Sequence, residues 1–271
     1  MIIGIDIGAT TTKAVSLEGG RLVKKIKTRA EDALSSAAGA FGKMLLENGI
    51  KMSDIERIMI TGAGATKIDG ELFGIPTEKV SEIRAIGTGA MFLSGRDNII
   101  IANIGTGTAL IEARKDGISH LGGSGLGGGT ILGLGKKLLS LSDYADIMKL
   151  AANGSLDPVD LLLEDIMVTD ISFLNKKSTA SNFGKMLDTA RQEDIAFGII
   201  NMVYQVIGMI SVFAARSRNI DSVIVTGWGS QNLLGQKVLA EITQMHSIAF
   251  EYPEDADYTT ALGAGLSGTS L

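Results

Sequence analysis

The first stretch of the sequence that could do chemistry is GIDIGATTTKAV, residues 4–15. It places the carboxylate of Asp6 at the end of an apolar run, followed by glycine, a threonine run and a lysine. A loop holds phosphate when its backbone N–H groups converge on the anion, which glycines and small hydroxyl side chains favour. Asp6 could hold Mg²⁺ through water, and phosphate could be held by Gly8, Thr10, Thr11, Thr12 and Lys13. An ordinary hairpin is the alternative for this turn alone.

The same pattern returns in IANIGTGTALI, residues 101–111. Gly105, Thr106 and Gly107 repeat the combination of glycine and hydroxyl between two apolar runs. Neither turn matches the glycine, lysine and serine or threonine spacing of a P-loop, and neither opens a helix as a dinucleotide fingerprint requires. Two matched strand-turn-strand motifs in one chain favour a pair of phosphate-holding turns over two unrelated hairpins.

Two further glycine segments could contact a nucleotide. VIVTGWGS, residues 223–230, is an apolar strand that ends at Gly227 and Gly229 before a helix. Gly127, Gly128 and Gly129 precede an apolar helix, whose N-terminal N–H groups could hold an anion. A plain strand-to-helix turn and a close packing site are the respective alternatives.

Composition sets the class of protein. The chain has 271 residues, a net charge of -5 and no cysteine, so we expect no nucleic-acid partner, disulfide, thiolate metal site or iron–sulfur cluster. No signal-peptide pattern opens the sequence, and a cytoplasmic protein is expected. The apolar run at 195–215 carries polar residues near one helical face, so it predicts a buried or subunit-interface helix and no membrane span.

The order of elements predicts an α/β fold with two related lobes, residues 1–95 and 96–271. The first lobe is expected to hold three strands, a helix over 31–48, a strand within 55–64 and a helix near 83–94. The second lobe is expected to continue with helical patterns to about residue 217, strands at 222–227 and 248–252, and a final helix from about Asp257 that packs back on the first lobe.

Paired phosphate turns and a later apolar strand ending in glycines resemble the actin, Hsp70 and sugar-kinase superfamily, in which ATP lies between two lobes. Within it, ANIGTGTAL, GGSGLGGGTILGLG (122–135), LSDYADIMKLAANG (141–154) and STASNFGKML (178–187) resemble the type II, eukaryote-like pantothenate kinases. Asn103 agrees, since these kinases have asparagine where many superfamily members have aspartate. The resemblance implies the two-lobed actin-like (ribonuclease H-like) fold, ATP and Mg²⁺ as cofactors, pantothenate as substrate, a homodimer, and coenzyme A or its thioesters as a possible inhibitor.

The resemblance also assigns roles to single residues. Glu82 stands where the family has its catalytic glutamate and would accept the proton of the pantothenate hydroxyl; the alternative is a solvated acid in the first turn of a helix behind Ser81. Tyr144 matches a tyrosine near the nucleotide. His120 replaces a family arginine of the substrate site, and an imidazole cannot make the bidentate contact of arginine. Arg84 could supply that charge instead, or belong to a surface ion pair.

Three other functions are compatible with parts of the pattern. A kinase for a sugar or amino sugar would keep the fold, although such kinases usually have an Asn-Asp pair that this chain lacks. An ATPase that drives a partner, like the activators of 2-hydroxyacyl-CoA dehydratases, would need cysteines for a bridging cluster. A non-catalytic nucleotide-binding regulator is the third, and His120 in place of the family arginine is the feature compatible with it.

Overall fold

Two five-stranded mixed sheets form the frame of the protein. The computed structural model describes residues 1–29, 32–167 and 175–269. In spatial order the first sheet contains β3 (Arg21–Arg29), β2 (Thr11–Glu18), β1 (Ile2–Ile7), β4 (Arg57–Thr61) and β5 (Thr77–Lys79). The second contains β8 (Gly117–Ser124), β7 (Thr108–Arg114), β6 (Asn98–Ile104), β11 (Ser222–Thr226) and β12 (Ala249–Glu251).

The two sheets have the same topology. Each has a central hairpin, β1–β2 or β6–β7, whose first strand also pairs in parallel with a later strand, β4 or β11. The register matches too: Asp6 faces Thr61 across β1 and β4, and Asn103 faces Thr226 across β6 and β11. The repeat expected from the two glycine-threonine turns therefore extends to whole sheets.

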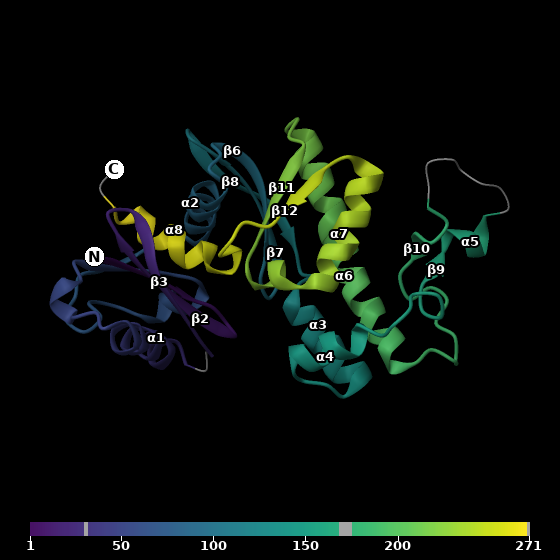
Figure 1. Ribbon diagram of the computed structural model, residues 1–271, viewed down its shortest axis with the longest axis horizontal. Helices are drawn as coiled ribbons and strands as arrows, with labels where there is room; N and C mark the ends of the chain where they lie inside the picture. Colours follow the sequence, from purple (N-terminus) through teal and green to yellow (C-terminus); the bar gives the residue numbers. More distant parts are fainter. Residues whose placement is uncertain (30–31, 168–174, 270–271) are drawn as a thin grey trace.

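Helices separate and flank the sheets in layers (Figure 1). On its outer face the first sheet packs against α1 (Ala33–Asn48), through a cluster that includes Phe41 and Met44. The outer face of the second sheet packs against α6 (Gln192–Ser217) and α7 (Leu233–His246). The predicted start of α1 at residue 31 lies outside the described residues.

Two helices, α2 (Glu82–Ser94) and α8 (Thr259–Ser267), fill the space between the sheets and pack on each other. Helix α8 lies on β1, β2 and β4, so the end of the chain packs on the first sheet. Helix α2 places Ile86 and Ala90 against the second sheet, although it precedes that sheet in the chain. The lobe boundary at residue 95 stays a prediction, because α2 belongs to the interface of both halves.

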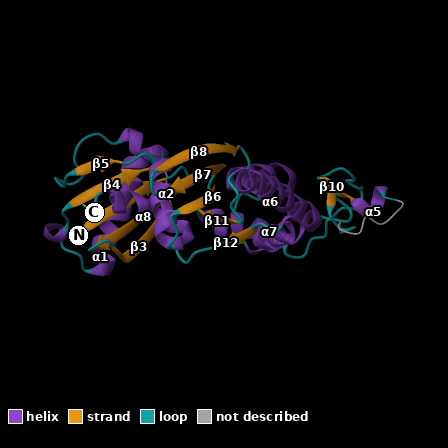
Figure 2. Cartoon of the chain, turned by 90° about the horizontal axis from the view of Figure 1, so that it is seen from above, coloured by secondary structure: helices purple, strands orange, loops and turns teal. Residues whose placement is uncertain are grey.

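The expected helical pattern up to residue 217 is wrong for much of 152–191. The second half of the chain does contain α3 (Gly128–Leu134), the π-helical turn Gly135–Leu139 and α4 (Tyr144–Ala151). After α4 the chain forms a projecting segment (Figure 2). This segment holds the two-stranded pair β9 (Leu161–Leu162) and β10 (Thr179–Ser181) and the single helical turn α5 (Leu163–Ile166). Gly154, Pro158 and Gly184 interrupt any helix there. Residues 168–174 lie outside the described part.

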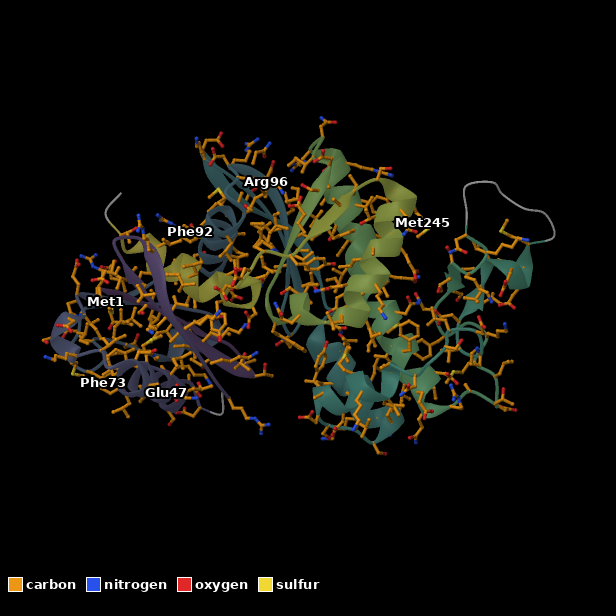
Figure 3. The ribbon with its side chains drawn as sticks, in the orientation of Figure 1. Met1, Glu47, Phe73, Phe92, Arg96 and Met245 are labelled. Atoms are coloured by element: carbon orange, nitrogen blue, oxygen red, sulfur yellow. The ribbon has the colours of Figure 1, made fainter. Side chains whose placement is uncertain are left out.

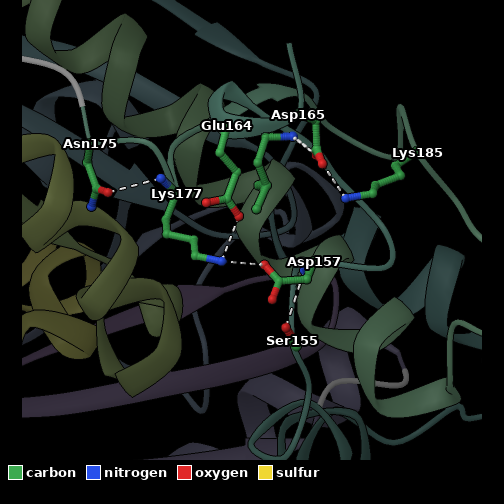
Figure 4. Close-up of polar contacts among 8 residues, drawn as sticks. Ser155, Asp157, Glu164, Asp165, Asn175, Lys177 and Lys185 are labelled. Carbon is green, nitrogen blue, oxygen red and sulfur yellow. Dashed lines mark hydrogen bonds and ion pairs between the residues drawn. The ribbon is translucent and has the colours of Figure 1, made fainter. Parts of the chain in front are cut away.

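Polar contacts hold the projecting segment together (Figure 4). Lys177 pairs with Glu164 and Asp157, and Lys185 pairs with Asp165. The buried carboxylate of Asp160 accepts from Asn201 of α6 at 2.8 Å. Met245, at the end of α7, lies on the side nearest this segment (Figure 3), and its sulfur is 3.7 Å from Ser178 Oγ.

Helix α6 is long and apolar enough to cross a membrane by length and composition alone. In the described chain, 61% of its most apolar window is buried inside the protein. It packs on α4, α7 and the second sheet, as the sequence predicted for a core helix.

Candidate functional site

The turns of both central hairpins open into one cleft of about 440 Å³ between the sheets. Its walls bring together residues from β1, β2, the start of α2, β6, β7 and the start of α8. The lining residues are Asp6, Gly8, Ala9, Thr10, Thr11, Lys13, Ala63, Glu82, Asn103, Gly105, Thr106, Gly107, Thr108, Ala109, Ser124, Gly227, Trp228 and Thr260. The two glycine-threonine turns predicted to act together therefore face the same space.

Asp6 and Lys13 form the charged floor of this cleft. They are direct partners across β1 and β2, so their side chains share one face of the sheet. Burial raises the pKa of the Asp6 carboxyl from 3.8 to about 7, an effect that Lys13 opposes and Glu82 increases. Burial also lowers the pKa of Lys13, against the attraction of Asp6 and Asp257, and its ammonium donates to the Asp257 carbonyl oxygen at 2.5 Å.

In the first turn, the Gly8 N–H donates to the Thr11 carbonyl at 3.1 Å and closes the loop. Thr10 and Thr11 line the cleft. Thr12 does not, because it follows Thr11 on a β-strand, where successive side chains alternate between faces; its side chain is fully buried opposite Ile7. Its predicted contact with a nucleotide is not supported by this position.

The second turn is closed by a bond from the Gly105 N–H to the Gly107 carbonyl at 2.8 Å. The glycine segment before α3 supports this turn from behind. The N–H groups of Gly128 and Gly129 donate to the carbonyls of Gly105 and Thr106, each at 2.9 Å, and a Cβ at Gly127 would lie 2.6 Å from the Thr106 carbonyl oxygen. In this structure the N–H groups of Gly128 and Gly129 stabilise the second turn and do not face the cleft. This agrees with the close packing site that the sequence offered as the alternative.

Glu82 is the first residue of α2 and lines the cleft beside Asp6. Ser81 makes no side-chain capping bond to the helix, which weakens the alternative that the two residues serve only as a helix start. The Glu82 side chain is exposed to solvent in the cleft. The surrounding protein still removes part of the water around its carboxyl, and this desolvation raises its pKa. A carboxylate with a raised pKa and room for a ligand suits a proton acceptor.

A second cavity of about 620 Å³ adjoins the first and shares Ala9, Thr10, Thr11 and Trp228 with it. Tyr144 lines it and meets the Trp228 ring edge to face, with 4.4 Å between ring centroids. Asn232 donates to the Tyr144 hydroxyl at 2.6 Å and fixes the aromatic pair. Lys27 and Arg29 of β3 form the opposite, basic wall.

Gly227 and Gly229 shape the turn that presents Trp228. Gly227 has φ +78°, and a Cβ there would lie 2.5 Å from the Ile104 carbonyl oxygen. A Cβ at Gly229 would lie 2.3 Å from the Ile104 side chain. The turn thus packs on the end of β6, which holds the Trp228 ring at the junction of the two cavities.

His120 and Arg84 do not line either cavity as the described residues define them. Both side chains are exposed, His120 on β8 and Arg84 in the first turn of α2. The lining residues that the sequence analysis did not assign include Ala63, Ser124, Trp228 and Thr260. Ala63 had a signal, because ITGAG at 60–64 repeats VTGWG at 225–229.

The cleft fits a divalent cation bound with phosphate. Mg²⁺ in proteins is held by one or two carboxylates, water and phosphate oxygens. Asp6 and Glu82 supply carboxylates here. Burial and the nearby Glu82 both increase the free-energy cost of ionising Asp6, a cost that a bound cation would reduce. Hydroxyl and glycine groups of the two turns lie on the same walls.

Comparison with solved structures shows the fold. An activator of 2-hydroxyisocaproyl-CoA dehydratase from Clostridium difficile, solved with ADPNP, matches with a TM-score of 0.70 at 19% identity, covering 98% of this chain and 93% of its own. A glucokinase of the ROK family from Streptomyces griseus, with glucose and AMPPNP, matches with a TM-score of 0.61 at 15% identity, covering 97% of each chain. The predicted two-lobed ATPase fold is confirmed.

Comparison of sequences confirms the resemblance. A type II pantothenate kinase from Bacillus anthracis is 29% identical, over 99% of this chain and 98% of its own. A type II pantothenate kinase from Staphylococcus saprophyticus is 28% identical, over 97% of this chain and 99% of its own. The family model Fumble matches residues 98–264, from the start of β6 into α8. The chain therefore belongs to the Fumble family.

Proposed function

We propose that the protein transfers the γ-phosphoryl group of ATP to the hydroxyl of pantothenate, the first step towards coenzyme A. The observation that carries this is the joining of two matched phosphate turns with Asp6 and Glu82 in one cleft. Relatives that match over almost the whole chain and bear the name type II pantothenate kinase support the choice of acceptor.

The cleft divides the work of phosphoryl transfer between its two walls. The turn at Gly8–Thr11 and the turn at Gly105–Gly107 hold the β and γ phosphates from opposite sheets, and Lys13 adds positive charge. Mg²⁺, oriented by Asp6, would neutralise charge on the phosphate oxygens. Positioning and electrostatic stabilisation account for most catalysis of this reaction.

Glu82 acts at the acceptor. It orients the pantothenate hydroxyl and takes its proton as the bond from that oxygen to the γ phosphorus forms. The bond between the γ phosphorus and the bridging oxygen breaks, and ADP leaves. The raised pKa of Glu82 brings its basicity closer to that needed near neutral pH.

The second cavity takes the nucleoside of ATP. Trp228 and Tyr144 offer aromatic surface for the base, and Lys27 and Arg29 offer charge near the phosphates. The shared wall at Thr10 and Thr11 lets one ligand extend across both cavities. On the other side, Gly227 and Gly229 pack on Ile104 and support Trp228, which also lines both cavities.

The proposal also includes a homodimer in the cytoplasm, with no nucleic-acid or membrane partner, and inhibition by coenzyme A or its thioesters. The family resemblance supports the dimer and the inhibitor. The acidic composition supports the absence of a nucleic-acid partner, and the burial of α6 inside the described chain supports the absence of a membrane span. His120 and Arg84 belong to the acceptor site only if the lobes close further over the ligand.

The test is ADP release by the purified protein with Mg-ATP, with and without pantothenate and beside a panel of sugars and amino sugars. Pantothenate-dependent ADP formation is expected, with phosphopantothenate identified by mass spectrometry. ADP formation only with a sugar would retain the kinase and overturn the acceptor. ATP binding with no turnover on any acceptor would favour a nucleotide-binding regulator.

A further inference from the structure

The two parallel strands that end at the cleft carry a matched pair of threonines. Thr61 is the last residue of β4 and Thr226 the last residue of β11. Each is fully buried, and each is followed by a glycine of positive φ, +87° at Gly62 and +78° at Gly227. The two positions are therefore equivalent in the repeat of the sheets.

The residues that these threonines face are also equivalent. Thr61 is in register with Asp6, and Thr226 is in register with Asn103. In parallel strands, partners in register project to the same face. The side-chain oxygens of Asp6 and Asn103 also lie near the glycine that follows each threonine. A Cβ at Gly62 would lie 2.6 Å from Asp6 Oδ1, and a Cβ at Gly227 would lie 3.0 Å from Asn103 Oδ1.

The two hydroxyls differ in one respect. Thr226 Oγ1 donates to Asn103 Oδ1 at 3.0 Å, whereas the Oγ1 of Thr61 is buried and has no hydrogen-bond partner among the residues that the structure describes. A buried hydroxyl without a partner is disfavoured and calls for a ligand-dependent or conformational reason. Within the described part of the chain, the hydroxyls of Thr12 and Ser16 also lack partners. Their register partners on β1 are Ile7 and Ile3, not a carboxylate.

We propose that Thr61 is a positioning residue for Asp6: its hydroxyl turns about the Cα–Cβ bond and donates to the Asp6 carboxylate, as Thr226 donates to Asn103. The inference rests on the proposed function, in which Asp6 orients Mg²⁺ on the phosphates of the nucleotide. The bond fixes one carboxylate oxygen and leaves the other directed at the cleft. Groups that orient a metal-binding carboxylate in this way raise metal affinity.

The experiment measures how Mg²⁺ changes the affinity for ADP, by calorimetry and by the fluorescence of Trp228, the single tryptophan. Neither readout needs an acceptor. Thr61→Val keeps the shape and removes the hydroxyl, Thr61→Ser keeps the hydroxyl, and Thr226→Val is the matched control in the second sheet. Thermal unfolding of every variant separates folding from binding.

Thr61→Val should raise about tenfold the Mg²⁺ concentration at which the change in ADP affinity is half-maximal. ADP affinity in EDTA should be unchanged. Thr61→Ser should restore the wild-type value, and Thr226→Val should leave it unchanged. If Thr61→Val does not fold, Thr61→Ala provides the same comparison.

An unchanged Mg²⁺ dependence in a folded Thr61→Val would overturn the proposal. Equal losses in the valine and serine variants would also overturn it, because they would show that packing, not the hydroxyl, matters. Wild-type protein whose ADP affinity ignores Mg²⁺ would overturn the role of Asp6 and this inference together. A wrong acceptor, in contrast, would leave the Mg²⁺ result as expected and appear only in the ADP-release assay.

Discussion

Gly89 of α2 and Gly263 of α8 face each other where the two helices cross between the sheets. A Cβ on Gly89 would lie 2.0 Å from the Thr259 carbonyl oxygen, and a Cβ on Gly263 would lie 1.7 Å from the Ala85 carbonyl oxygen. Backbone therefore meets backbone at this point, which only glycine permits. Glu82 and Thr260, at the starts of these helices, both reach the cleft.

Gly263→Ala should destabilise the protein. The added methyl cannot fit without moving α2 and α8 apart, and such overpacking costs about 1–3 kcal/mol or more. Urea unfolding at neutral pH measures the free energy of unfolding. Gly39→Ala is the control: among the described residues, an added Cβ at this position in α1 meets no atom within 4 Å beyond its chain neighbours and the backbone of its own helix. It should stabilise the protein by about 0.5–1 kcal/mol. Equal effects of the two variants would contradict the close crossing.

Glu82→Gln should strongly lower the rate of phosphoryl transfer while ADP binding is kept. The amide cannot accept the proton, and loss of a general base lowers turnover by about 10²–10⁴-fold. Steady-state turnover with pantothenate and ADP affinity by calorimetry give the two readouts. Glu71→Gln, at an exposed carboxylate outside the cleft, is the control and should leave both unchanged. Turnover that survives in Glu82→Gln would remove Glu82 from its proposed role.

Trp228→Ala should weaken ADP binding about tenfold or more, because stacking of a base on an aromatic ring is worth about 1–3 kcal/mol. Trp228→Phe should recover part of the affinity. Calorimetry is the measurement, since the alanine variant has no tryptophan. Phe213→Ala, an exposed aromatic on α6, is the control. ADP affinity that is the same in Trp228→Ala and Phe213→Ala would place the base elsewhere.

Acid should weaken the attachment of the projecting segment to α6 through Asp194. The hydrogen-bonded ion pair with Arg191, and the N–H groups of Arg191 and Ser155, lower the pKa of Asp194 from 3.8 to about 2. A carboxyl whose pKa is lower in the folded state stabilises above its unfolded pKa, and this contribution is lost as pH falls from 3.8 towards about 2.

The measurement is the free energy of unfolding against pH over that acid range. Asp194→Asn should have a lower free energy of unfolding than the wild type at neutral pH. Its free energy of unfolding should also fall less steeply as the pH is lowered through the acid range. Asp188→Asn, at an exposed carboxylate nearby, should follow the wild-type curve. Parallel curves for Asp194→Asn and the wild type would show that Asp194 does not have the lowered pKa.

The pairing of the two phosphate turns was predictable because Gly8 and Gly105 lie in nearly the same local sequence, and local sequence determines a hairpin turn. The cleft position of Glu82 was predictable only through the family resemblance. The nucleotide contact of Thr12 stays a prediction. Thr12 does not line the cleft, and the alternation of side chains along a β-strand distinguishes it from Thr11 and Lys13. The nucleotide contacts of Gly128 and Gly129 stay predictions, and in this structure their N–H groups bond to the second turn instead.

Other features could not be read from the sequence because they depend on distant contacts. The crossing of α2 and α8 brings Gly89 to Gly263, and neither local pattern identifies the other as its partner. The projecting segment keeps the buried Asp160 through bonds from Thr179, Asn182 and Asn201. This network of distant partners stabilises a segment in which Gly154, Pro158 and Gly184 already interrupt a helix, so the helical pattern expected there was wrong.

The packing of α8 on the first sheet has a consequence for how the chain is made. Ile2, Val15 and Met59 belong to strands that leave the ribosome early, but they share a hydrophobic cluster with Leu262 and Ala264 of the last helix. The face of the first sheet that this cluster covers is therefore completed only after α8 has been made. The first sheet waits for a helix that follows the second sheet in the chain.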